Sequence, residues 1–245
     1  MKKSLELLGI ESSGLVQDSL KAENRKTDEE LLALVEKIGS EAEKEKYLRS
    51  VIDKKSAGLV KSKRYLANLV KGNDPLFACE LIYSASRSSP VDPINYLLFG
   101  QIAMEHKALA VAKTSFEIVK WLSSDKHKDI LEKVKESGGT DNSKDKLWYN
   151  KAPDKFWILQ RLFYQSLFSK LSEYAFRLLD VFPDDKSNYE IVYKALSLIE
   201  DDNYIRSFIS YVKERLSNDK VNLNLFLGMS YYRISEFDSS ISYLK

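Results

Sequence analysis

The residues best suited to metal binding or covalent catalysis are two histidines and one cysteine in a chain of 245 residues. Neither His106 nor His127 has a second His or a Cys at the spacing of a zinc ligand set, so we expect no metal site. His106 falls at a predicted helix turn and is expected to be solvated. Cys79 occupies a small-residue position of a predicted helix, where a buried and unreactive thiol is expected.

Nucleotide-binding and acid–base motifs are also missing from the sequence. Gly138-Gly139 has no flanking strand and no phosphate-binding lysine, and the surrounding polar segment has the composition of a flexible linker. The acidic pairs Asp184-Asp185 and Asp201-Asp202 lie at predicted helix breaks, where helix capping explains them. We therefore expect no cofactor and no catalysis, although an enzyme on a helical-repeat scaffold remains a third possibility.

A basic segment at residues 44–71 is the one feature that suggests nucleic-acid binding. Nine basic residues stand there against Glu45 and Asp53, a local surplus of seven positive charges: Lys44, Lys46, Arg49, Lys54, Lys55, Lys61, Lys63, Arg64 and Lys71. No recognised reader motif or stacking aromatic accompanies them. The chain as a whole carries a formal net charge of only +2. Nucleic-acid binding by this segment is kept as an alternative function.

The composition favours an all-helical protein. Hydrophobic residues make up 44% and charged residues 30%, with only 9 Gly and 5 Pro. No apolar run approaches the 18 or so residues of a transmembrane helix, and the N-terminal residues are not interpreted as a signal peptide. A lone cysteine excludes an internal disulfide framework. A cytoplasmic location is therefore expected.

Start and stop signals divide the chain into helices. Thr27 to Glu30 has the form of a capping box and precedes apolar residues at helical spacing. Breakers at residues 72–75, 88–93, 183–187 and 200–203 separate the later helices. We expect four regions: a weakly ordered segment at 1–26, a helical region at 27–125, an insertion with a short helix and a flexible loop at 126–154, and a second helical region at 155–245.

An internal repeat is the strongest signal in the sequence. Five reference positions are separated by 33, 63, 32 and 33 residues: Ala67, Gly100, Phe163, Ala195 and Gly228. Small residues follow 12 positions later (Cys79, Ala112, Ala175, Ser207, Ser240), and large residues follow 16 positions later (Tyr83, Phe116, Leu179, Tyr211, Leu244). Small residues at two positions let paired helices approach closely, and the large residue fills the remaining space.

The last copy, Leu227-Gly228-x-x-Tyr231 followed by Phe237, Ser240 and Leu244, resembles the tetratricopeptide repeat (TPR) family. So does the copy Tyr96-x-x-Phe99-Gly100-x-x-Ala103. The resemblance implies an all-α fold, a right-handed α-solenoid of antiparallel helix pairs. The repeats here are one residue shorter than is usual in the family. Two residues also depart from its pattern, because Phe163 replaces a small residue and Lys194 an apolar one.

The last pair is expected to be incomplete, since Lys245 falls inside its second helix. Apolar residues of that pair would then be partly uncovered: Leu227, Tyr231, Phe237, Ile241 and Leu244. A pair of helices in a solenoid needs a neighbour on each side. We expect either a longer solenoid or self-association through this end.

The resemblance further implies that the first helix of each pair lines a concave groove. The residues expected to face it are Arg64, Asn68, Trp157, Gln160, Tyr164, Tyr189, Val192, Leu196, Leu225, Met229 and Tyr232. Arg64 and Asn68 match the spacing with which some family members hold a terminal carboxylate, although the next expected contact falls on Leu98. The apolar part of the groove either binds a partner peptide or helix, or is filled by the chain's own Leu147-Trp148-Tyr149 or N-terminal segment.

The sequence thus predicts a non-catalytic scaffold or adaptor that binds a protein partner in a concave groove, within a larger assembly or alone. No metal, cofactor or membrane span is expected. Nucleic-acid binding through residues 44–71 is the alternative.

Overall fold

The computed structural model describes residues 26–52, 58–123, 152–216 and 219–245. Within these ranges helices account for 77% of the residues and no strand occurs, so the predicted all-α class is confirmed. The expectations for segment 1–26, for His127 and for the loop of the insertion, including Leu147-Trp148-Tyr149, lie outside the described residues, apart from residues 26 and 152–154.

Twelve helices follow one another along the described ranges. They are α3 (Asp28–Glu36), α4 (Glu41–Val51), α5 (Val60–Val70), α6 (Pro75–Ser88), α7 (Pro93–Glu105), α8 (Leu109–Leu122), α11 (Lys155–Tyr164), α12 (Phe168–Val181), α13 (Lys186–Leu196), α14 (Asp202–Arg215), α15 (Lys220–Arg233) and α16 (Phe237–Leu244). In these ranges, no helix is both long and apolar enough to cross a membrane.

Side-chain caps explain where many of these helices begin. The capping box of α3 forms as predicted, with the Thr27 amide donating to Glu30 Oε2 at 2.8 Å and the Glu30 amide donating to Thr27 Oγ1. An aspartate accepts a first-turn amide at the start of six later helices: Asp74, Asp92, Asp154, Asp185, Asp201 and Asp219. The capping role predicted for the acidic pairs is therefore confirmed at Asp185 and Asp201.

Helix α5 takes its cap from a different helix. Its N-cap residue, Leu59, has a left-handed backbone (φ 49°) and offers no side-chain acceptor. Instead, the carboxylate of Asp28 in α3 accepts the amides of Lys61 and Ser62 at 2.9 Å each, and the Ser62 hydroxyl at 2.6 Å. This carboxylate satisfies amides that would otherwise be unpaired, so it fixes α3 against the start of α5.

Three hairpins share one type of turn. Lys107, Ser166 and Ser235 join α7–α8, α11–α12 and α15–α16, and all three have positive φ, between 57° and 63°. In each turn the residue that follows donates its amide to a carbonyl five positions earlier, at 2.8 to 2.9 Å, which is the bonding of a Schellman-type helix end.

Superimposing these turns corrects the repeat register of the third pair. Counted back from the turn, Leu159 rather than Phe163 is equivalent to Gly100 and Gly228. Leu159 is fully buried, whereas Phe163 is only partly buried. The register assigned from the sequence was one helical turn too late, because counting from Phe163 placed the small Ala175 and the large Leu179 at the expected positions.

Small and large residues pack across the hairpins as predicted in two pairs. A Cβ added to Gly100 would lie 2.8 Å from Phe116 of α8, and one added to Gly228 would overlap with Leu244 of α16. The third pair reverses the sizes, with Leu159 and Ala175 both fully buried. In the fourth pair the expected small residue, Ser207, is exposed, and the adjacent Phe208 is buried instead.

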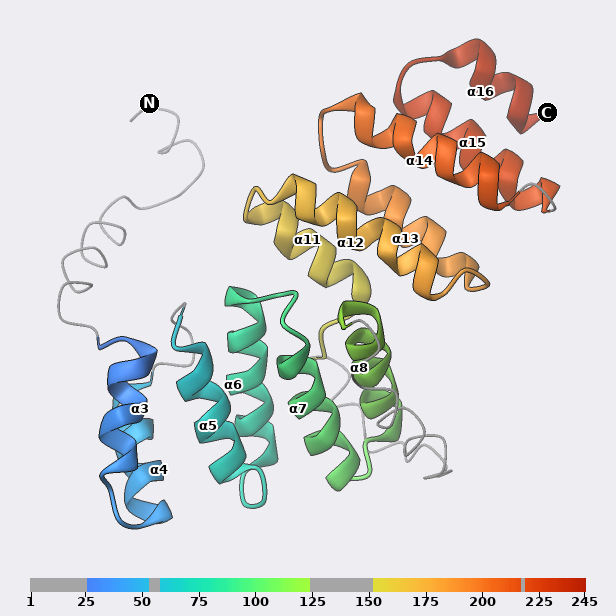
Figure 1. Ribbon diagram of the computed structural model, residues 1–245. Coiled ribbons are helices and arrows are strands. Elements are labelled where there is room, and N and C mark those ends of the chain that lie inside the picture. Colours follow the sequence, from blue (N-terminus) through green and yellow to red (C-terminus); the bar gives the residue numbers. More distant parts are fainter. Residues whose placement is uncertain (1–25, 53–57, 124–151, 217–218) are drawn as a thin grey trace, which may run out of the picture.

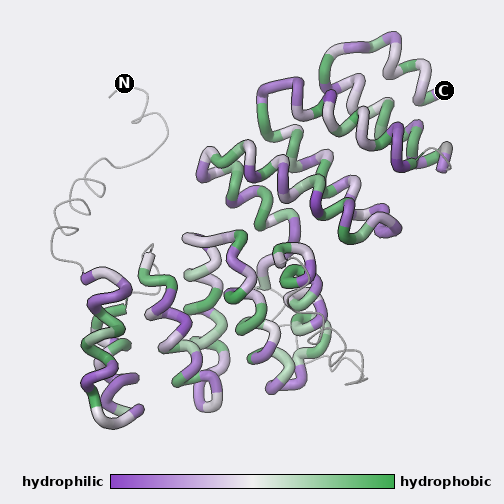
Figure 2. The backbone as a smooth tube through the Cα atoms, viewed as in Figure 1, coloured by the Kyte–Doolittle hydropathy of each residue, from purple (hydrophilic) through white to green (hydrophobic). Residues whose placement is uncertain are grey.

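The helices form two groups, each with its own hydrophobic cluster. One cluster extends from Leu31 to Phe116, and the other joins the end of α8 to α11–α15. Figure 1 shows α3–α8 side by side and α11–α16 running across their direction. Hydrophobic and hydrophilic residues alternate along several helices in Figure 2, such as α5 and α12, as expected for helices buried on one side. Trp121 of α8 joins the groups by donating its Nε1 hydrogen to the carbonyl of Tyr174 at 2.8 Å.

Candidate functional site

The carboxylate clamp suggested by Arg64 and Asn68 is not available for a partner. Arg64 forms an ion pair with Asp92, and its Nε donates to Asn95 Oδ1 at 2.7 Å. Only 14% of its side chain is exposed. Asn68 is exposed, but the clamp also needs Arg64, which is already paired. The sequence did not show these partners, because Asp92 and Asn95 lie about 30 positions later, at the start of α7.

The basic segment at 44–71 is partly neutralised by the fold. Lys61 pairs with Glu29 at 2.7 Å, Lys71 pairs with Glu105 at 2.7 Å, and Arg49 pairs with Glu45 at 2.8 Å. Lys63 is fully buried, with its ammonium donating to Ser84 Oγ at 2.8 Å. Lys54 and Lys55 lie outside the described residues. Carboxylates from outside the segment therefore offset part of its charge surplus, at Lys61, Arg64 and Lys71.

Two residues considered for metal or covalent chemistry have structural surroundings. Cys79 is buried in α6, as predicted. The expectation of a solvated His106 was wrong: its ring is partly buried, and Nε2 lies 3.0 Å from the carbonyl oxygen of Lys71. That contact links the end of α7 to the end of α5.

The apolar stripe expected on α13 lies in the core and cannot line a groove. Tyr189 is 1% exposed, and Val192 and Leu196 are fully buried. The Tyr189 ring packs on Phe226 of α15 with centroids 5.8 Å apart, and burial raises the pKa of its hydroxyl from the ordinary tyrosine value. An apolar stripe on a helix packs against whichever neighbours cover it, and here α12, α14 and α15 lie around α13.

The residues of α15 that were predicted to face the groove form a separate exposed patch. Leu225 is 46% and Tyr232 is 66% exposed, whereas Met229 is partly buried. Tyr232 packs edge-on against Phe237 of the next helix. The uncovered residues predicted for the last pair include three that are about half exposed (Phe237, Ile241, Leu244), but Leu227 is 1% exposed and belongs to the core.

The remaining predicted groove residues belong to α11, which contacts α6. Trp157 of α11 packs on Tyr83 of α6 with ring centroids 5.2 Å apart. Two turns later, the Gln165 side-chain amide donates to the carbonyl of Arg87 at 3.0 Å. Because Tyr83 and Arg87 are one turn apart on α6, the end of α6 lies beside α11 over this stretch. We call the surface formed by Trp157, Gln160, Arg161, Tyr164 and Leu167, together with the adjoining end of α6 at Arg87, the α6–α11 surface.

Arg161 lies at the middle of the α6–α11 surface, between two aromatic rings. Its guanidinium carbon is 6.0 Å from the ring centroid of Trp157 and 6.0 Å from that of Tyr164, close enough for cation–π attraction. Its Nε is buried without a hydrogen-bond partner, whereas neither terminal nitrogen is buried without one. No carboxylate in the described ranges forms an ion pair with Arg161 or Arg87, so the terminal nitrogens of Arg161 face solvent.

Two exposed apolar side chains, Tyr164 and Leu167, lie near Arg161 on the α6–α11 surface. Tyr164 is 63% exposed and Leu167 is 38% exposed. The Tyr164 ring is supported by Phe163, whose centroid lies 5.8 Å away, and Phe163 in turn packs on Phe168. Exposed aromatic and arginine side chains on a packed support are typical of binding hot spots.

The sequence identified part of this surface. Trp157, Gln160 and Tyr164 were expected to face a partner; Tyr164 is exposed, and Trp157 and Gln160 are partly buried on the same helix. It missed Arg161, although aromatic residues four positions before it and three after it put all three side chains on one helical face. It also missed the position of Arg87, whose backbone carbonyl accepts a hydrogen bond from the Gln165 side chain next to this surface.

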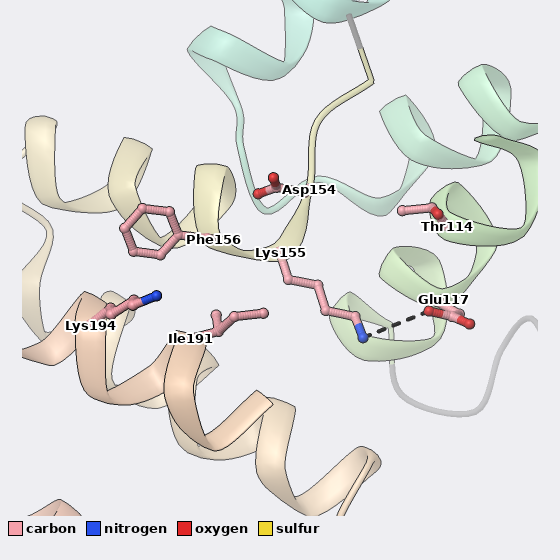
Figure 3. Close-up of a pocket in the computed structure, with 7 residues that line it drawn as sticks. All are labelled: Thr114, Glu117, Asp154, Lys155, Phe156, Ile191 and Lys194. Atoms are coloured by element: carbon pink, nitrogen blue, oxygen red, sulfur yellow. Dashed lines mark ion pairs between the residues drawn. The ribbon is translucent and has the colours of Figure 1, made fainter. Parts of the chain in front are cut away.

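A cleft of about 420 Å³ lies between α8, α11 and α13 (Figure 3). Lys155 extends from α11 toward Glu117 of α8, with 3.7 Å between the ammonium and the carboxylate. Its ammonium also lies 3.8 Å from the Asp185 carboxylate and 3.2 Å from Asn188 Oδ1. With 12% of its side chain exposed, Lys155 ties three helices together. Because Glu117 and Asp185 already neutralise the Lys155 ammonium, we consider the cleft a weaker candidate for ligand binding than the α6–α11 surface.

Comparison with known proteins adds no identity to this geometry. No family model matches the sequence, and no curated protein is significantly similar to it.

Proposed function

We propose that this protein is a non-catalytic interaction scaffold that holds a peptide segment of a protein partner on the α6–α11 surface. The observation that carries the proposal is Arg161, held between Trp157 and Tyr164 with its terminal nitrogens open. A side chain held in place by its neighbours loses little freedom on binding. Tyr164 adds an apolar area that is 63% exposed and rests on packed rings.

We also propose that the helices build a TPR-like right-handed α-solenoid. Three observations support it: the shared turn of three hairpins, the small–large packing at Gly100 and Gly228, and the contacts of α11 with α13 and of α13 with α15. The change of direction between α8 and α11 interrupts the stack (Figure 1). The α6–α11 surface lies at this change of direction, and we expect no such surface in a regular stack.

Nucleic-acid binding through residues 44–71 has lost its main support, because Lys61, Arg64 and Lys71 are paired with carboxylates. A cytoplasmic location remains our proposal, since a chain with a single cysteine has no internal disulfide framework.

The proposal is tested with peptides selected on the wild-type chain from a random dodecapeptide phage library. Each selected peptide is synthesised with fluorescein, and its affinity is measured by anisotropy. We expect Tyr164→Ala to weaken binding about tenfold, which corresponds to about 1.4 kcal/mol. Tyr232→Ala is the matched control, because Tyr232 is equally exposed (66%) but lies on α15. Peptides that bind Tyr164→Ala as well as wild type, with helicity unchanged, would contradict the proposal.

A further inference from the structure

We propose that the α6–α11 surface recognises an acidic peptide segment, in which side-chain carboxylates pair with Arg161 and Arg87 and an adjacent apolar side chain packs on Tyr164. This inference rests on the proposed function and specifies the chemistry of the partner.

The first argument is the unbalanced charge of this surface. Most arginines in the described ranges are paired with carboxylates: Arg49, Arg64, Arg206, Arg215 and Arg233. Arg87, Arg161 and Arg177 have no ion pair there, and two of these three lie on the α6–α11 surface. Helix α11 contains no acidic residue, and the only one in α6, Glu80, is about two turns from Arg87. The surface therefore lacks the negative charge that a partner can supply.

The second argument is the state of the Arg161 guanidinium. Its position between Trp157 and Tyr164 restricts the plane in which it lies. Because Nε is buried, a ligand reaches Arg161 only at its two terminal nitrogens. Two parallel N–H donors match the two oxygens of a carboxylate, which arginine binds more specifically than lysine does.

The third argument is the exposed aromatic side chain of Tyr164 beside the Arg161 guanidinium. Tyr164 follows Arg161 by three residues, a rise of about 4.5 Å along α11. An extended peptide covers that distance with one or two residues. The peptide is therefore expected to carry an aromatic or aliphatic side chain one or two positions from an Asp or Glu. In Figure 1, α11 lies beyond the end of α6, so the peptide crosses the junction between the two groups of helices.

The experiment examines the peptides selected from the dodecapeptide library and their binding to arginine variants. We expect enrichment of Asp and Glu next to an apolar residue, and a loss of about tenfold when the peptide's acids are replaced by their amides. Arg161→Met is expected to weaken binding about tenfold, and Arg87→Met about threefold. Arg177→Met is the matched control, because Arg177 is also unpaired but lies on α12, and it should leave affinity unchanged.

Two further variants and a competing probe make each result decisive. Arg161→Gln provides a second substitution if Arg161→Met lowers the thermal midpoint. Arg161→Lys keeps the charge but loses the paired donors, and should weaken binding about fivefold. A fluorescein-labelled dodecauridylate tests single-stranded RNA on the same surface. If it binds in an Arg161-dependent way and no acidic peptide does, the proposed ligand class is wrong.

The outcomes separate this inference from the proposed function. Neutral peptides that depend on Tyr164 but not on Arg161 overturn the acidic class and leave docking at this surface standing. If no peptide is enriched on wild type relative to Tyr164→Ala, both proposals fail. Acidic peptides that depend on Arg161 and Tyr164, but not on Arg177, support both.

Discussion

Replacing Gly100 by Ala tests the packing that holds a helical hairpin together. The new Cβ would lie 2.8 Å from Cε1 and 2.9 Å from Cζ of Phe116. Both distances are well below an ordinary carbon–carbon contact of about 3.5 to 4.0 Å. Phe116 is 1% exposed, so the added Cβ forces either its packed ring or the two helices to shift.

Two opposing effects determine the size of the change. Alanine favours a helix interior over glycine by about 1 kcal/mol, whereas overfilling a packed core costs about 1 to 3 kcal/mol. We expect Gly100→Ala to lower the free energy of unfolding by about 1 kcal/mol, a decrease of about 2 to 4 °C in Tm for a chain of this size. Urea unfolding followed by circular dichroism at 222 nm measures it.

A double-mutant cycle identifies the cause. In the background of Phe116→Leu, the smaller side chain relieves the contact, and Gly100→Ala should then cost about 1 kcal/mol less. Gly72→Ala is the control, because a Cβ there meets nothing within 4 Å. If Gly100→Ala instead stabilises the chain by about 1 kcal/mol, and its effect is additive with Phe116→Leu, the proposed contact does not exist.

Three further predictions concern other parts of the fold. Asp28→Ala should destabilise α3 and α5 by about 1 to 2 kcal/mol and speed hydrogen exchange at the amides of residues 61 and 62, whereas Glu29→Gln should have little effect. Lys186 and Asn222 lower the pKa of Asp219 to about 2, so its stabilising contribution is complete above pH 4 and is lost as the pH falls through 2; urea midpoints of Asp219→Asn should lack this loss. Ile241→Asp should reduce self-association measured by sedimentation velocity, because Ile241 is half exposed on α16; equal association of both chains would exclude this helix as the contact.

Structural features that depend on residues close in sequence were predictable, and features that depend on another helix were not. The capping box at Thr27 and the close approach at Gly228 follow from residues near in sequence, and both are present. The register of the third pair was missed because Leu159 and Ala175 exchange the large and small positions. The same interhelical space can be filled from either side, and sequence spacing does not show which side is used.

The candidate site shows the same division. Tyr189 was predicted to face the concave groove, and it lies in the core instead. Arg64 looked available until α7 supplied Asp92 as its partner. Arg161 gave no signal as a single charge, because its significance depends on the two rings around it and on the lack of acidic residues in α11.

The most direct test of the proposed docking surface is hydrogen exchange of the wild-type chain, followed by mass spectrometry, with and without a saturating selected peptide. The account predicts slower exchange in residues 83–89 and 157–167, and no change in residues 225–232. Protection confined to residues 225–232, or to the described part of residues 44–71, would contradict it.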